Sequence, residues 1–80
     1  MRPDDDSGYR ELGALIAKAR RKAGLSQEHL AEKLGRSQGY VSKMELGRRK
    51  LDVLEFLEVA GAVGLDPADV IRRLKSGGRR

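Results

Sequence analysis

The spacing of apolar residues along the chain predicts five short helices. Apolar positions recur three and four residues apart in five segments, which span residues 9–23, 26–34, 37–46, 52–63 and 66–74. This spacing puts the apolar positions of each segment on one face of a helix. No run of alternating apolar and polar residues reaches the length of a strand. The predicted fold class is therefore all-α.

Residues at the borders of the segments support the same five helices. Ser26 and Ser37 each precede an apolar run, where a serine hydroxyl can accept a hydrogen bond from a free backbone N–H of the first turn. Asp52, with Glu55 three residues later, has the spacing of a capping box. Pro67 stands at the favoured first position of the last helix. Glycines end the first four helices, namely Gly24, Gly35, Gly47 and Gly64.

The inward faces of these helices define the expected core. Aromatic residues make up only 4% of the chain, so the core is expected to be mainly aliphatic. Ala31 is expected where the second and third helices cross, because closely approaching backbones need a small residue. The expected inward positions are Leu12, Leu15, Ile16, Ala19, Ala23, Leu30, Ala31, Leu34, Val41, Met44, Val53, Phe56, Leu57, Ala60, Val63, Val70, Ile71 and Leu74.

Length and charge describe one small basic domain. The chain has 80 residues, which is enough for a single domain, and a formal net charge of +5. Residues 1–8 contain one arginine and three aspartates without periodicity, and we expect them to form a disordered acidic tail. We expect the folded domain at 9–75 and a flexible basic end at 76–80. A domain this basic favours a polyanionic partner, with a merely soluble basic surface as the alternative.

Composition excludes or disfavours several kinds of chemistry. The chain has no cysteine, which excludes a disulfide, a thiol nucleophile and a cysteine-ligated zinc site. His29 is the single histidine, so a histidine cluster for a metal is impossible, and we expect it on a helix surface. No paired base and nucleophile is visible, so neither an enzyme nor a cofactor is predicted. The G-x-x-G at 61–64 has the form found in KH domains, but it lies at the end of a helix, which argues against that interpretation.

Nothing in the sequence indicates contact with a membrane. No apolar run reaches the ~18 residues that suggest a membrane span. The N-terminus, MRPDDDSG, lacks the apolar core of a signal peptide. We therefore expect a soluble cytoplasmic protein.

Residues 26–46 have the form of a helix, a short turn and a second helix, which is the sequence form of a helix-turn-helix. Gly35 supplies a residue that tolerates positive φ in the turn. The second of these helices is expected to protrude, and a protruding helix fits the major groove of B-DNA. Glutamine can pair with the edge of adenine, and lysine with guanine or a phosphate. The expected base-reading residues are Gln38, Gly39, Ser42 and Lys43.

The stretch AGLSQEHLAEKLGRSQGYVSKMELGRR resembles the helix-turn-helix of the phage repressor and Cro-like (XRE) regulators. LSQ, LAEKLG and S-x-x-Y-V-S-K-M-E, with the glycine that follows, keep their relative places. The resemblance continues through LDVLEFLEVAGAVGLDPADVI, which is similar to the fourth and fifth helices of that family, and covers roughly residues 10–74. It implies a compact five-helix, lambda-repressor-like domain that binds double-stranded operator DNA as a symmetric homodimer.

The resemblance also implies roles for individual residues. Gln27, the first residue of the second helix, would hold a phosphate, and Gln38 and Lys43 would read bases. Tyr40 lies near these two residues. It is expected either to contact DNA or to cover the edge of the core. The loop after the third helix would grip the DNA backbone. With Arg36 and Tyr40 added as further candidates, the expected phosphate-binding residues are Gln27, Arg36, Tyr40, Arg48, Arg49 and Lys50.

One implied ion pair and a few departures from the family complete the expected site. Arg20 would pair with Glu45, which would tie the first helix to the end of the third. Arg36 occupies a turn position that is usually apolar, so we expect it to point outward. Gly39 stands where relatives often present a base-reading side chain, so it either permits close backbone approach or leaves one base pair unread. Leu46 and Leu51 stand where polar residues or proline are common in the family. Leu51 is expected to anchor the basic loop.

The end of the fourth helix and the fifth helix are predicted to form a two-fold dimer interface. A dimer of this kind needs a self-complementary patch, and VGLDPADVIRRL is more apolar than one helix can bury inward. Leu65 and Ile71 are expected at the centre, with Arg72 and Arg73 at the rim or paired with aspartates across the axis. The small patch predicts weak self-association that DNA strengthens. The expected interface residues are Val63, Leu65, Val70, Ile71 and Leu74.

Three functions remain open at this point. The first is a dimeric transcriptional repressor that occupies a promoter. The second is a restriction–modification controller protein, which would also activate transcription by touching polymerase. The third, from another class, is a protein-binding module such as an antitoxin that masks a toxin. An excess of exposed apolar surface beyond one dimer patch would favour the third.

Overall fold

The five predicted helices are all present in the computed structural model, which describes residues 7–77. They are α1 (Ser7–Lys22), α2 (Gln27–Leu34), α3 (Gln38–Glu45), α4 (Val53–Val63) and α5 (Pro67–Gly77). Within the described range, no strand accompanies them. The predicted all-α fold class is therefore confirmed.

Both terminal helices extend slightly beyond their predicted limits. α1 begins at Ser7, so the last two residues of the expected acidic tail are helical. α5 continues to Gly77, so the first two residues of the expected basic end are helical as well. Serine and glycine are weak helix formers, but Tyr9 and Leu74 pack against the core and hold these end turns in place. The remaining tail residues, 1–6 and 78–80, lie outside the described residues.

The predicted helix caps are present with their expected partners. The hydroxyl of Ser26 accepts a hydrogen bond from the backbone N–H of His29 at 3.0 Å, and Ser37 does the same for Tyr40 at 3.1 Å. Asp52 and Glu55 form a reciprocal capping box at the start of α4. These contacts satisfy N–H groups that a helix leaves free at its start. The starts of α2, α3 and α4 are therefore defined by local chemistry.

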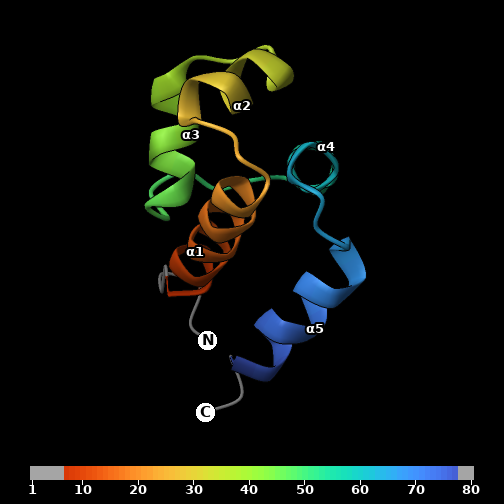
Figure 1. The fold of residues 1–80 in the computed structure, drawn as a ribbon. Coiled ribbons are helices and arrows are strands. Elements are labelled where there is room, and N and C mark those ends of the chain that lie inside the picture. Colours follow the sequence, from red (N-terminus) through yellow and green to blue (C-terminus); the bar gives the residue numbers. More distant parts are fainter. Residues whose placement is uncertain (1–6, 78–80) are drawn as a thin grey trace.

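The helix-turn-helix lies at one end of the molecule. Figure 1 shows α2 and α3 at that end, α4 viewed along its axis, and α5 running back toward the start of α1. α1 contacts α3, α4 and α5, while α2 contacts α3 and α4. The long first helix is thus the support on which α3 and the last two helices are assembled.

The core is mainly aliphatic, as predicted, but α4 is rotated from its expected orientation. Val59 is 1% exposed and belongs to the core, whereas Val53 is 72% exposed and Leu57 also faces outward. The segment VLEFLEVAGAV is apolar nearly all round, so its pattern permits more than one inward stripe. Packing against α1 and α2 selects Phe56, Val59, Ala60 and Val63. Two further expected core residues, Ala23 and Ile71, are exposed.

One close approach of two backbones involves a glycine that the sequence pattern did not single out. Gly13 is buried in α1, and a Cβ atom placed on it would lie 2.5 Å from the carbonyl oxygens of both Met44 and Glu45. Real Cβ atoms do not come this close to backbone oxygens, so only glycine fits between α1 and the end of α3. Gly47 is a second such position, because a Cβ atom placed on it would lie 2.6 Å from the backbone of Arg10. Its φ of 77° also favours glycine.

Candidate nucleic-acid interface

The outer face of α3 presents most of the predicted base-reading residues to the outside. Gln38, Gly39 and Lys43 are exposed, and Ser42 is half-buried. Ser37 caps this helix, and Val41 and Met44 anchor its opposite face in the core. The outer face of α3 is therefore rigidly supported and accessible. Since Ser42 is partly covered, the accessible readers are chiefly the two long side chains and the glycine backbone.

A buried ion pair lies directly behind this face. Arg20 Nε donates to Glu45 Oε2 at 2.6 Å, and a second guanidinium nitrogen lies 3.1 Å from Oε1. The remaining terminal nitrogen of Arg20 donates to the backbone oxygen of Leu25 at 2.8 Å. The Glu45 side chain is only 5% exposed. The expected pair thus has bidentate geometry and ties α1 both to α3 and to the segment before α2.

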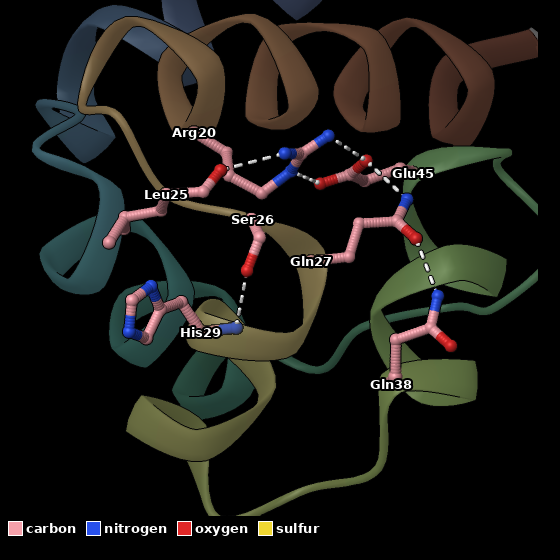
Figure 2. Close-up of polar contacts among 7 residues, drawn as sticks. All are labelled: Arg20, Leu25, Ser26, Gln27, His29, Gln38 and Glu45. Carbon is pink, nitrogen blue, oxygen red and sulfur yellow. Dashed lines mark hydrogen bonds and ion pairs between the residues drawn. The ribbon is translucent and has the colours of Figure 1, made fainter.

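Hydrogen bonds continue from this ion pair to the surface. Gln27 Nε2 donates to Glu45 Oε1 at 2.9 Å, and Gln38 Nε2 donates to Gln27 Oε1 at 2.7 Å. Figure 2 shows this relay running from Arg20 through Glu45 and Gln27 to Gln38. An ionised carboxylate can only accept, so the NH₂ of Gln27 must face Glu45 and its oxygen must face outward. The ion pair therefore determines how both glutamine amides are oriented.

A second polar cluster lies on the α4 side of α3. The guanidinium carbons of Arg36 and Arg49 lie 4.9 and 4.5 Å from the centre of the Tyr40 ring. Arg49 also donates to Glu55 Oε2 at 2.8 Å, and Arg36 lies 3.8 Å from the same oxygen. Tyr40 packs against the core as well, so it performs one of its two expected roles and supports the arginines. We refer to Arg36, Tyr40, Arg49 and Glu55 as the arginine cluster.

Glu55 is held in its ionised form by its surroundings. The backbone N–H of Asp52 lowers the pKa of Glu55, and the guanidinium of Arg49 lowers it further, while partial burial acts in the opposite direction.

The Arg49 Nε is buried and, among the residues that the structure describes, has no hydrogen-bond partner. The sequence pattern showed Glu55 only as part of a capping box, so its contacts with the arginines were not foreseen.

The basic loop after α3 divides into exposed and engaged residues. Arg48 and Lys50 are exposed, whereas Arg49 is engaged in the arginine cluster. The backbone N–H of Arg48 bonds to the oxygen of Lys43 at 2.9 Å, which closes the loop against the end of α3. Leu51 packs against the core, as expected for an anchor, while Leu46 is exposed. The loop therefore carries two exposed cations beside α3.

The predicted dimer interface is only partly supported by the exposed surface. Val63 and Val70 are buried inside the chain, so they serve the core and cannot form the centre of an interface. Ile71 is exposed, and Leu65 and Leu74 are half-buried. Arg72 pairs with Asp69 of its own helix, three residues earlier, at 2.7 Å, and not with an aspartate across a two-fold axis. The apolar surface near this end shifts instead toward the start of α4, through Val53, Leu54 and Leu57.

No helix among the described residues is long and apolar enough to cross a membrane. In the same part of the chain, no group of three or more histidine, cysteine, aspartate or glutamate residues could hold a metal ion.

Comparison with known proteins identifies the family to which this fold belongs. The helix-turn-helix domain family matches residues 11–74. The uncharacterized HTH-type transcriptional regulator y4dJ of Sinorhizobium fredii is 37% identical over 60 residues, which are 75% of this chain and 78% of the relative.

Solved structures agree. An XRE-family like protein from Pseudomonas syringae is 39% identical, with a TM-score of 0.78 and coverage of 89% of this chain and 87% of that one. The restriction–modification controller protein C.AhdI from Aeromonas hydrophila is 30% identical, with a TM-score of 0.75 and coverage of 84% and 97%. The extended match and the five-helix fold lead to one conclusion: the chain belongs to the helix-turn-helix domain family, among the XRE-type transcriptional regulators.

Proposed function

We propose that this regulator binds double-stranded operator DNA by inserting α3 into the major groove and that it acts as a homodimer. The observation that carries this proposal is the relay that ends at Gln38, because it presents one oriented amide on the outer face of α3. The proposal involves no catalytic step and no cofactor. Because the proposed ligand is operator DNA, we also propose that the protein is located in the cytoplasm.

The relay gives Gln38 the donor and acceptor pattern that suits adenine. Its Nε2 uses one hydrogen for Gln27, which leaves the second hydrogen and the Oε1 atom for a base edge. Adenine offers an N7 acceptor and an N6 donor in the major groove. A preoriented amide loses less conformational freedom on binding than a free one. Lys43, five residues further along α3, would read guanine or contact a phosphate.

Phosphate contacts fit the residues around this reader. Gln27 is the first residue of α2, where free backbone N–H groups and the helix dipole favour an anion. Arg48 and Lys50 are exposed in the loop on the other side of α3. Arg36 and Arg49 would contribute through the arginine cluster. These groups would position α3, while the base contacts would select the sequence.

The proposed dimer surface is the outer side of α4 together with Ile71. Val53 and Ile71 line the same open apolar groove, together with Tyr9, Leu12, Phe56 and Leu74. Leu54 and Leu57 extend this apolar surface along α4. A second copy of the chain would cover it with two-fold symmetry and leave both α3 helices free. Sedimentation of Leu54→Asp and Ile71→Asp, beside the wild type, tests this surface, and unchanged self-association in both variants would place the interface elsewhere.

Repression by occupying a promoter needs only DNA binding, so it is the regulatory outcome that we propose. A controller-type role, in which the dimer also activates transcription, is the second candidate. The similarity to C.AhdI over nearly the whole of that controller protein supports it.

Selection of bound sites from random DNA tests the proposed function. We expect a pseudo-palindrome whose half-site centres lie about one helical turn, ~34 Å, apart. Gln38→Ala should weaken binding by about 1–3 kcal/mol and relax the preference at one base pair in each half-site. Arg48→Ala serves as the contrasting variant, since it should weaken all sequences alike and flatten the salt dependence. A lone asymmetric site, or unchanged selectivity in Gln38→Ala, would contradict the proposal.

A further inference from the structure

The arginine cluster holds two cations against one carboxylate at the edge of the proposed DNA surface. Glu55 Oε2 lies 2.8 Å from a terminal nitrogen of Arg49 and 3.8 Å from one of Arg36. The side chains of the two arginines are 38% and 40% exposed, while that of Glu55 is 17% exposed. Solvent, and therefore a phosphate, can reach both guanidinium groups more easily than the carboxylate behind them.

The position of Glu55 is imposed by its own helix. Its Oε1 accepts a hydrogen bond from the backbone N–H of Asp52 at 3.0 Å, and its N–H donates to the Asp52 carboxylate at 2.8 Å. This capping box leaves Oε2 as the oxygen that faces the arginines. The carboxylate is thus preset before any ligand arrives, and the arginines are arranged around it and beside the Tyr40 ring.

A carboxylate at this position competes with DNA for the same groups. Carboxylates and phosphates both bind guanidinium groups through charge-assisted hydrogen bonds, and each arginine has a limited number of donors. Phosphate contacts supply most of the binding that is independent of sequence. When the protein binds DNA independently of sequence, an arginine that leaves Glu55 gives up an ion pair for a phosphate contact of similar kind.

We propose that Glu55 is a specificity-determining residue: it restrains Arg36 and Arg49, so that they contact phosphates fully only when α3 is seated in the groove. This inference rests on the proposed function, because it assumes that the cluster faces DNA. In the seated complex the duplex meets both arginines where Glu55 and Tyr40 already hold them. Elsewhere on DNA the arginines would have to leave the cluster, so Glu55 weakens sequence-independent binding more than operator binding.

The test measures binding of the full chain to a random duplex and to the selected operator over a range of salt concentrations. Glu55→Gln removes the charge but keeps an oxygen that can accept from Asp52. Glu58→Gln is the matched control, because Glu58 is an exposed glutamate one turn further along the same helix. Thermal melts of each variant set a common temperature well below the lowest midpoint, so that all proteins are folded during the comparison.

We expect Glu55→Gln to bind the random duplex at least about threefold more tightly than Glu58→Gln does at 50 mM salt, with a smaller gain on the operator. One additional phosphate contact makes the salt slope steeper by about 0.9, so the gain should shrink about threefold between 50 and 200 mM salt. Arg36→Gln supplies a second, independent measurement. It should weaken random-duplex binding more in the Glu55→Gln background than in the wild type.

Three results would overturn the inference: no gain on the random duplex relative to Glu58→Gln, an equal gain on random and operator DNA, or an Arg36→Gln effect that is independent of Glu55. Failure of the proposed function looks different. In that case the wild type would select no sequence, while the random-duplex measurements would still report whether Glu55 restrains the arginines. A chain that binds no DNA at all would refute both.

Discussion

The two sides of α3 carry arginine–carboxylate contacts of opposite character. On the α1 side, Arg20 and Glu45 form a one-to-one pair whose side chains are 11% and 5% exposed. On the α4 side, two arginines share the single carboxylate of Glu55, and their side chains are more than a third exposed. The first arrangement balances its charges inside the protein, whereas the second presents a surplus positive charge to the surface.

This difference assigns separate roles to the two sides of α3: one keeps side chains oriented, and the other provides charge that a ligand can use. A buried, fully bonded network keeps its members in one arrangement, because any unpaired member would carry a large desolvation penalty. A partly exposed cluster is screened by water and salt, so its contacts can be exchanged for those of a ligand at small cost. The α1 side therefore orients the proposed base reader, and the α4 side adjusts the proposed affinity for phosphate.

The largest effect should follow from breaking the buried pair. Glu45→Ala leaves Arg20 without its partner, so we expect a loss of about 3–5 kcal/mol in the free energy of unfolding. Glu28→Ala, on the exposed surface of α2, is the control and should change stability little. Thermal or urea unfolding measures both. The combined change Arg20→Met and Glu45→Leu should be far milder in stability, yet it should still release the Gln27 and Gln38 amides.

The next effect concerns the backbone contact beside the same pair. Gly13→Ala would force α1 away from the carbonyl oxygens of Met44 and Glu45, so we expect a loss of about 1–3 kcal/mol. Gly61→Ala is the matched control, because nothing beyond its chain neighbours and the nearby backbone of its own helix lies within 4 Å of its Cβ position. The control should gain up to about 1 kcal/mol from improved helix propensity. Equal unfolding free energies for the two variants would show that α1 and α3 are not in close backbone contact.

A smaller change is expected on the outer face of α3. Gly39 has only the hydroxyl oxygen of Ser37 near its Cβ position, at 3.8 Å, which is an ordinary contact distance. Gly39→Ala should therefore raise the free energy of unfolding by up to about 1 kcal/mol through helix propensity. Binding to the selected operator decides between the two roles that remain open for this glycine. A marked loss of affinity indicates close backbone approach to DNA, whereas unchanged affinity indicates a base pair that is not read.

The smallest expected effect is a pH dependence on the α4 side. The pKa of Glu55 is lowered in the folded chain, so its ionised form stabilises the fold at pH values above the unfolded value of about 4.3. This contribution is lost as the pH falls through the lowered folded pKa. The difference in melting temperature between the wild type and Glu55→Gln should thus be constant near neutral pH and shrink in acid. A difference that grows on acidification would contradict the assigned contacts.

Much of the fold and part of the site could be predicted from the sequence. The helix borders followed from the Ser26 and Ser37 caps and from the capping box of Asp52 and Glu55, all of which the structure confirms. The Arg20–Glu45 ion pair followed from the family resemblance. The inward stripe of α4 was wrong at Val53 and Leu57, and the functions of the exposed residues of α3 stay predictions.

The sequence by itself determined what depends on neighbours within a turn or two of helix. Caps, glycine stops and apolar periodicity act between residues that are three or four positions apart, so the order of the residues is sufficient to reveal them. The tertiary structure alone decided which distant groups meet. Gly13 lies against Glu45, and Arg36 reaches Glu55, only because the helices pack at particular rotations and distances. Those rotations result from the burial of the whole core, a sum over many side chains that no short segment contains.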